Sequence, residues 1–90
     1  MAPAPVARII KKKPTAEVRE LRKRVEELER QIHALEQRIA EIGALLTNPR
    51  MYADGDRVRE VSRERKAAEE QMTGLLREWE NLSTELAAHD

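Results

Sequence analysis

Few side chains in this sequence could carry out catalysis or hold a metal ion. There is no cysteine, and His33 and His89 are the only histidines, so a zinc site of cysteine and histidine ligands cannot form. No glycine-rich phosphate loop, no His-Glu-x-x-His motif and no serine or cysteine nucleophile beside a histidine is present. We therefore expect no catalytic, cofactor-binding or metal-binding residues and no small-molecule substrate.

Lysine and arginine form the one pattern that indicates binding. Residues 48–66 contain six basic side chains, among which Arg59, Arg63 and Lys66 recur at the i, i+4, i+7 spacing of one helix face. Such a stripe can follow a phosphate backbone, and lysines near the N-terminus can bind phosphates as well. The candidate nucleic-acid-binding residues are Lys11, Lys12, Lys13, Arg19, Arg50, Arg57, Arg59, Arg63 and Lys66.

The same residues have a second interpretation as a solvated charged surface, because Glu60 and Glu64 are interleaved with them. No predicted element offers side chains that could read base edges, so any binding would contact phosphates and tolerate different base sequences. Residues 1–24 contain eight basic and two acidic groups, whereas residues 67–90 contain one and six, although the net charge of the chain is zero. A basic start, a basic middle and an acidic end therefore say more about possible partners than the zero net charge does.

The composition narrows the fold class. Of the 90 residues, 38% are charged and 2% are aromatic, and Glu, Lys, Arg, Ala and Leu predominate. Such a composition is typical of long helices and coiled coils. No apolar run reaches 18 residues, and the N-terminus lacks the apolar core of a secretory signal. We expect an all-α, soluble, cytoplasmic protein with no membrane segment.

The apolar residues of the first half predict a long helix over residues 15–46. Thr15 can cap its first turn, and Glu17 lies near its positive end. Glu20/Arg24 and Glu26/Arg30 are spaced to form ion pairs on its exposed side. Its apolar positions alternate in steps of three and four residues, which is a heptad repeat, and they are Val18, Leu21, Val25, Leu28, Ile32, Leu35, Ile39, Ile42 and Leu46.

A connector at residues 47–55 and a second helix at 56–89 follow. Pro49 ends the first helix, because the residue before a proline is disfavoured in the α conformation, and one 3₁₀ turn is expected around 50–52. Asp54 or Asp56 can cap the second helix, and residues 1–14 form a flexible basic linker interrupted by prolines. The second helix repeats the heptad spacing through Val58, Val61, Arg65, Ala68, Met72, Leu75, Trp79, Leu82 and Leu86.

Two such helices are expected to pack antiparallel as an intramolecular coiled-coil hairpin. In the register that we favour, Trp79 packs in the core opposite Leu28, and Arg65 extends its guanidinium outward. Tyr52 is expected to fold back over the helix ends. The β-branched residues of the first helix also fit a parallel two-stranded coil, so a monomer is the main prediction and a homodimer is the alternative.

The connector Asn48-Pro49-Arg-Met-Tyr52 and the ending Trp79-Glu80-Asn-Leu82 resemble the C-terminal coiled-coil domain of ABC-F ATPases, over about residues 14–88. In that family Pro49 and Tyr52 would shape the turn, and Trp79 would pack in the hairpin. The resemblance implies an accessory arm that binds DNA or ribosomal RNA, in a protein with two ATP-binding cassettes that are not within these 90 residues.

The sequence therefore predicts a non-enzymatic nucleic-acid-binding coiled-coil arm. It is either an excised domain of an ABC-F ATPase or a free-standing relative. The alternative is a coiled coil for protein–protein interaction or oligomerisation that does not bind nucleic acid.

Overall fold

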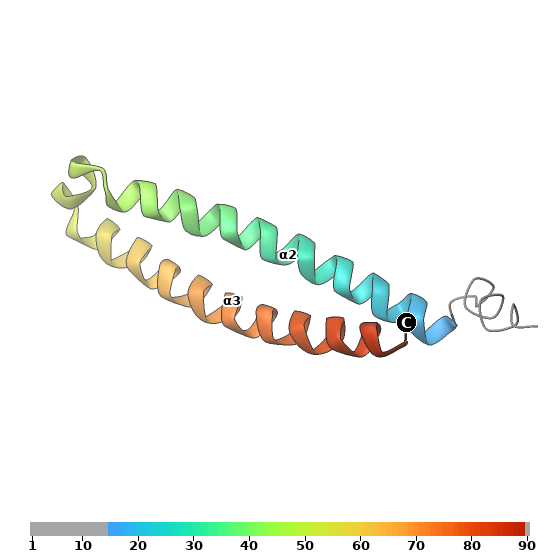
Figure 1. Cartoon of the computed structure of the whole chain (residues 1–90). Helices are drawn as coiled ribbons and strands as arrows, with labels where there is room; N and C mark the ends of the chain where they lie inside the picture. The colour runs from blue at the N-terminus through green and yellow to red at the C-terminus, as the bar shows by residue number, and fades with distance from the viewer. Residues whose placement is uncertain (1–14, 90) are drawn as a thin grey trace, which may run out of the picture.

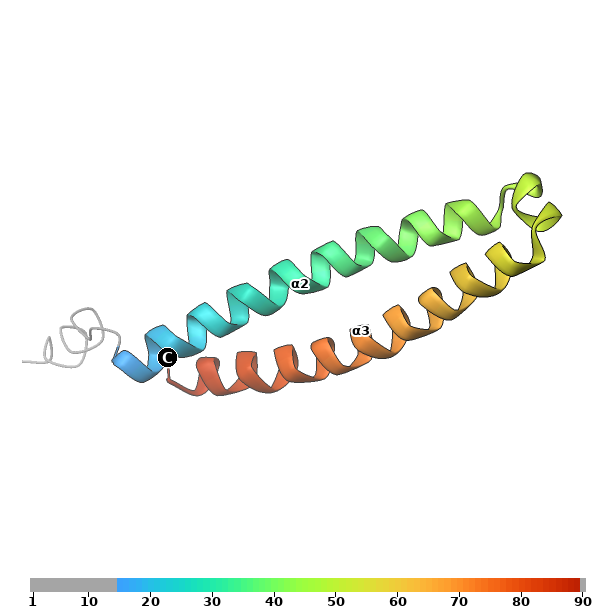
Figure 2. The same ribbon diagram turned by 180° about the vertical axis from the view of Figure 1, so that it is seen from behind.

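A computed structural model describes residues 15–89 of the chain as two long antiparallel helices joined at one end (Figure 1). Helix α2 spans Ala16–Leu46, the short 3₁₀ helix η1 spans Pro49–Ala53, and helix α3 spans Gly55–His89. The helices lie side by side along their length in both views (Figure 2). The predicted all-α helical hairpin is confirmed. The predicted basic linker at residues 1–14 lies outside the described residues.

The start of α2 follows from a side-chain cap. The hydroxyl of Thr15 accepts a hydrogen bond from the backbone N–H of Val18 at 3.1 Å, while Thr15 itself has extended backbone angles (φ −75°, ψ 168°). This bond satisfies one of the backbone donors that a helix leaves free at its N-terminus. The helix consequently begins at Ala16, one residue later than the predicted boundary.

Three polar or rigid residues shape the connector between the helices. The side chain of Asn48 accepts a hydrogen bond from the N–H of Arg50 at 3.0 Å, and Pro49 begins η1. Proline suits the first helical position because its missing N–H would have no helical partner there. Asp54 accepts a hydrogen bond from the N–H of Arg57 at 3.2 Å, so Asp54 rather than Asp56 caps α3.

The core is a single line of apolar side chains between the helices. The side chains of Leu28, Ile42 and Val61 have 0%, 0% and 1% of their surface exposed. All three residues occupy predicted heptad positions. The apolar side of α2 therefore packs against the apolar side of α3. Arg65, the basic residue in this pattern, lies exposed and reaches Glu69 at 3.8 Å, so its guanidinium does turn outward.

Trp79 lies on the seam between the helices, at the heptad position where it was predicted to pack. The residue is half-buried, and its indole N–H donates a hydrogen bond to the Glu29 carboxylate at 3.1 Å. An indole N–H requires an acceptor, so the ring stays at the edge of the interface. Because Glu29 follows Leu28 directly, the contact places Trp79 beside the turn of α2 where the favoured register puts it.

Two ion pairs that were predicted within α2 are replaced, one by a pair between the helices and one by another pair within α2. Arg24 donates to Glu78 at 2.7 Å instead of pairing with Glu20, and Arg30 pairs with Glu27 at 2.7 Å instead of with Glu26. Partners on α3 lie within reach of an arginine at the edge of the seam, which the sequence of one helix cannot reveal.

A second pair of the same kind joins the helices nearer the connector. Arg38 donates to both carboxylate oxygens of Glu64, at 2.5 and 2.8 Å. Arg38 is 14 residues from Arg24 in α2, and Glu64 is 14 residues from Glu78 in α3, so the two helices keep one register between the two ion pairs.

Neither α2 nor α3 contains an apolar stretch sufficient for a transmembrane segment.

Candidate functional site

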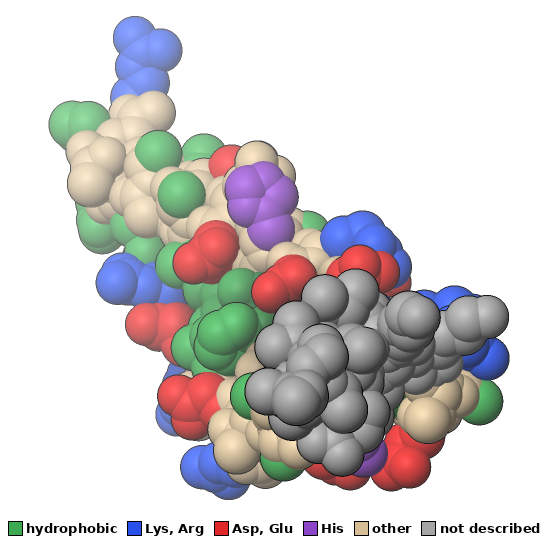
Figure 3. Space-filling model, turned by 45° about the vertical axis from the view of Figure 1, so that its right-hand side comes forward, with side chains coloured by type: hydrophobic (Ala, Val, Ile, Leu, Met, Phe, Trp, Pro, Cys, Tyr) green, Lys and Arg blue, Asp and Glu red, His purple; other side chains and the backbone are tan. Residues whose placement is uncertain are grey.

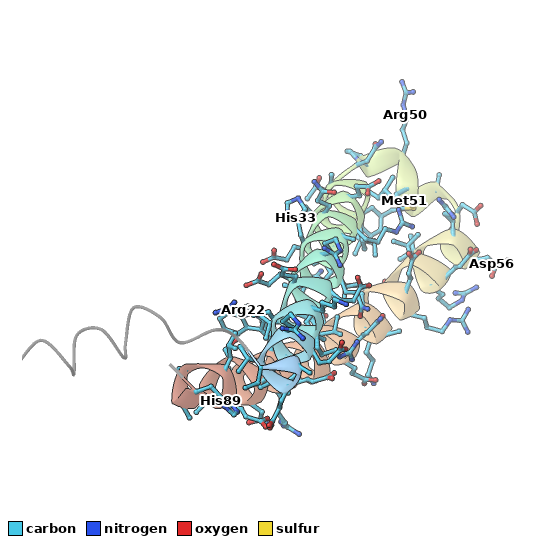
Figure 4. All side chains as sticks on the ribbon, turned by 90° about the vertical axis from the view of Figure 1, so that its right-hand side faces the viewer. Arg22, His33, Arg50, Met51, Asp56 and His89 are labelled. Atoms are coloured by element: carbon cyan, nitrogen blue, oxygen red, sulfur yellow. The ribbon has the colours of Figure 1, made fainter. Side chains whose placement is uncertain are left out.

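The predicted nucleic-acid-binding residues fall at the two ends of the hairpin. Arg19 lies in the first turns of α2, near the end opposite the connector. Arg50 lies in η1 and extends away from the rest of the protein (Figure 4). The remaining described candidates lie in the first third of α3 and are exposed; they are Arg57, Arg59, Arg63 and Lys66. Lys11, Lys12 and Lys13 lie outside the described residues.

Ion pairing divides the cations at the connector end into two groups. Arg57 lies 3.7 Å from Glu60, and Arg59 pairs closely with Asp56, one turn away in the same helix. Arg50, Arg63 and Lys66 have no acidic partner among residues 15–89. We refer to Arg50, Arg63 and Lys66 as the connector-end cations.

The acidic residues interleaved with these cations are already engaged elsewhere. Asp56 and Glu60 pair with Arg59 and Arg57, and Glu64 is held across the hairpin by Arg38. The hydrogen bonds from Arg38 lower the pKa of the Glu64 carboxyl below its usual range, and the same contact raises the pKa of Arg38. These contacts leave Arg63 and Lys66 facing solvent with their charges uncompensated by a direct partner.

Arg63 and Lys66 also share a direction. They are three residues apart within one continuous helix, so their side chains leave neighbouring positions on one face, as the sequence predicts. Elsewhere, basic and acidic side chains lie next to one another over the visible face of the rod (Figure 3). Arg22 and Arg77 are also exposed and lack an acidic partner among residues 15–89, but they are only two, on different helices and away from the connector. The connector end has three such cations, so a ligand with regularly spaced negative charges would find its best contacts there.

Tyr52 lies at the same end and is held in place by a backbone contact. Its hydroxyl donates a hydrogen bond to the carbonyl oxygen of Leu46 at 2.5 Å, so the side chain folds back onto the end of α2 as predicted. Tyr52 as a whole nevertheless remains 60% exposed. This contact fixes η1 against the last turn of α2 and so fixes the base from which Arg50 projects.

Comparison with protein families matches residues 17–84 to the ABC transporter C-terminal domain. The chain belongs to this family. The matched range covers most of α2, the whole connector and α3 as far as Thr84, so the ABC transporter C-terminal domain corresponds to the hairpin itself. Searches of curated proteins and of solved structures gave no significant match. The resemblance to the C-terminal domain of ABC proteins is thus confirmed, and the hairpin is a helical domain associated with that class.

One group of side chains at the opposite end was missed by the sequence reasoning. Glu17 at the start of α2 meets Glu85 and His89 at the end of α3, with one ligand atom from each residue within 4.8 Å of the others. The four-residue spacing of Glu85 and His89 is visible in the sequence and places them on one helix face. The third member follows only once the antiparallel register is known.

Proposed function

We propose that this ABC transporter C-terminal domain is a nucleic-acid-binding arm whose connector end contacts phosphates. The observation that supports the proposal most is that Arg50, Arg63 and Lys66 are exposed and have no acidic partner in the described part of the chain. A cation already in an ion pair must give up that contact before it binds a phosphate. A cation without a partner has no such contact to lose, and it releases counterions from the nucleic acid when it binds.

The paired cations at this end have a different role in the proposal. Arg57 and Arg59 lie beside Glu60 and Asp56, so each contributes less positive field toward a ligand than Arg63 or Lys66. Their pairs neutralise the acids that would otherwise repel phosphate. The candidate residues at the connector end therefore form two groups. Arg50, Arg63 and Lys66 contact phosphates directly, and Arg57 and Arg59 neutralise the acids beside them.

Binding of this kind would tolerate different base sequences. Phosphate contacts position a protein on a nucleic acid but carry no sequence information. The partner is therefore a DNA or RNA duplex bound through its backbone, without a small-molecule substrate. The arm has no catalytic function of its own in this proposal; ATP hydrolysis would belong to cassettes of a cytoplasmic ABC-F ATPase, as the resemblance of the connector implies.

The alternative function is binding to a protein. One observation favours it: the exposed ring of Tyr52 lies close in sequence to Arg50 at the free end of the rod. Tyrosine and arginine are enriched among residues that dominate protein interfaces. Oligomerisation through the heptads has less support, because the apolar positions of α2 and α3 already pack against each other within one chain.

Fluorescence anisotropy with labelled DNA and RNA duplexes at low salt tests the proposal. The double variant Arg63→Gln/Lys66→Gln should weaken binding to duplexes of unrelated sequence by the same factor. The matched control is Arg22→Gln/Arg77→Gln, which likewise removes two exposed cations that have no acidic partner among residues 15–89, but away from the connector. A Lys11→Gln/Lys12→Gln/Lys13→Gln variant measures the share of the N-terminal lysines.

Two results would count against the proposal. The first is the absence of duplex binding by the wild-type chain at low salt. The second is equal loss of affinity in the connector-end variant and in its matched control, which would show that only total charge matters. Loss of binding to a protein partner on Tyr52→Ala, with duplex binding absent throughout, would favour the alternative.

A further inference from the structure

The end of the hairpin opposite the connector brings together one histidine and two glutamates from both helices. Glu17 lies in the first turn of α2, and Glu85 and His89 lie in the last turns of α3. One ligand atom from each side chain lies within 4.8 Å of the other two, and the Nε2 atom of His89 lies 3.7 Å from a carboxylate oxygen of Glu17. Figure 4 shows His89 at this end of the rod.

The fold explains why these groups meet. Glu85 and His89 are four residues apart in a continuous helix, so both side chains leave the same face. The antiparallel arrangement then places the start of α2 beside the end of α3. Two carboxylates are thereby held close together, where their like charges repel each other unless a cation lies between them.

We propose that Glu17, Glu85 and His89 form a binding site for a divalent transition-metal ion of the zinc class. One imidazole nitrogen and two carboxylate oxygens are a donor set that such ions accept, and three protein ligands leave a fourth position for water. The nitrogen donor separates this group from a purely acidic cluster, which would suit calcium or magnesium better. This donor set is distinct from the cysteine and histidine set that the sequence excludes.

The geometry requires only side-chain movement to close around an ion. Metal–ligand bonds of about 2.0–2.1 Å in a tetrahedral site place neighbouring ligand atoms roughly 3.3 Å apart. The separation between His89 and Glu17 is 3.7 Å, close to that value. Glu17 is two-thirds exposed and His89 one-third exposed, so neither side chain is locked by packing. The C-terminal end of α3 also carries the negative end of its helix dipole, which favours a cation.

A metal bound here would join the start of α2 to the end of α3, which are the helix ends that separate most easily. The last turns of helices fray, and here the first turn of α2 and the last turn of α3 lack a covalent connection to each other. An ion ligated by both helices would bind the folded hairpin more tightly than the unfolded chain. Its binding free energy would therefore appear as stability of the fold.

Thermal denaturation of the untagged, chelator-treated full chain with ZnCl₂ tests the site, followed by circular dichroism. At a free zinc concentration ten times the dissociation constant, the folded-to-unfolded ratio should rise about tenfold, which corresponds to an increase in Tm of roughly 5–10 °C. MgCl₂ at the same concentration should leave Tm nearly unchanged. The variants His89→Gln and Glu85→Gln should each abolish most of the zinc-dependent shift.

His33→Gln is the matched control, because His33 is an exposed histidine of α2 outside the group of three. Its zinc-dependent shift should equal that of the wild type. The proposal is overturned if zinc leaves the Tm of the wild type unchanged, if magnesium has the same effect, or if His89→Gln keeps the full shift. Any of these results would leave the contact between His89 and Glu17 without a role in zinc binding, and would leave the nucleic-acid proposal untouched.

Discussion

Replacing Leu28 by alanine should remove a large part of the stability of the hairpin. The side chain of Leu28 has no exposed surface, and it lies in the single apolar line between α2 and α3. Truncation of a buried leucine costs about 3–5 kcal/mol in well-packed cores. We expect a loss near the lower end, about 3 kcal/mol, because a two-helix rod has no third layer and can close partly around the gap.

A loss of about 3 kcal/mol is a large part of the free energy of unfolding of the hairpin. A domain of this size has a free energy of unfolding of about 4–11 kcal/mol, taken from about 0.05–0.15 kcal/mol per residue. If the free energy of unfolding falls by about 1 kcal/mol per molar urea, the urea concentration at the midpoint of unfolding should fall by roughly 3 M. Equilibrium urea titration followed by circular dichroism at the helix band measures this shift.

Leu76→Ala is the matched control for this experiment. Leu76 is also a leucine inside a long helix, but 42% of its surface is exposed. Its replacement should change the free energy of unfolding by no more than about 0.5 kcal/mol, since alanine also has a slightly higher helix propensity. Equal shifts of the midpoint for Leu28→Ala and Leu76→Ala would refute the packing described for the seam.

Three further predictions concern single contacts. Thr15→Ala should destabilise the hairpin by about 1 kcal/mol, because it removes the side-chain cap of α2. Thr15→Ser keeps the capping hydroxyl and should leave the stability unchanged. Urea titration of the two variants measures the difference. Tyr52→Phe removes the hydrogen bond to the Leu46 carbonyl and should lower the free energy of unfolding by about 0.5 kcal/mol. It should also increase the rate of amide hydrogen exchange in η1. An unchanged exchange rate would contradict the role of Tyr52 in holding η1 against α2. The pKa of Glu64 is lower in the folded chain than its ordinary value of 4.5, because Arg38 hydrogen-bonds the carboxylate. The ionised Glu64 side chain therefore stabilises the fold above about pH 4.5. This stabilisation is lost as the pH falls through the lower pKa of the folded state. The Tm should therefore fall on acidification below pH 4.5, less steeply for Glu64→Gln, and identical profiles for the two proteins would exclude this role.

Heptad spacing and end signals were sufficient to predict the architecture of this chain. The apolar positions from Val18 to Leu46 predict one helix, Pro49 predicts its end, and Thr15 predicts its start to within one residue. These signals act locally or through a fixed period, so they can be recognised without knowledge of the partner helix. Residues such as Asn48, whose side chain caps η1, act over two positions and belong to the same kind of signal.

Contacts between the helices were predicted less well. Arg24 has an acidic residue four positions before it, yet it pairs with Glu78, because α3 presents a carboxylate at the edge of the seam. Trp79 occupies an apolar position of the heptad, but the acceptor for its N–H lies on the other helix and determines how far it is buried. Such choices depend on the register, which the period of one helix does not determine.

The candidate site shows the same division. The stripe of Arg63 and Lys66 follows from the spacing of residues in one helix and could be predicted. The distinction between cations with and without acidic partners required the structure, because Glu64 is removed from the stripe by Arg38 of the other helix. The group at Glu17 was not predicted for the same reason.

The dependence of duplex affinity on salt concentration tests the proposed function most directly. Each phosphate contact contributes about −0.9 to the slope of log K against log salt for double-stranded DNA. If Arg63 and Lys66 both contact phosphates, the slope for Arg63→Gln/Lys66→Gln should be less negative than that of the wild type by about 1.8. The slope for Arg22→Gln/Arg77→Gln should remain that of the wild type. An unchanged slope in the connector-end variant would contradict the account.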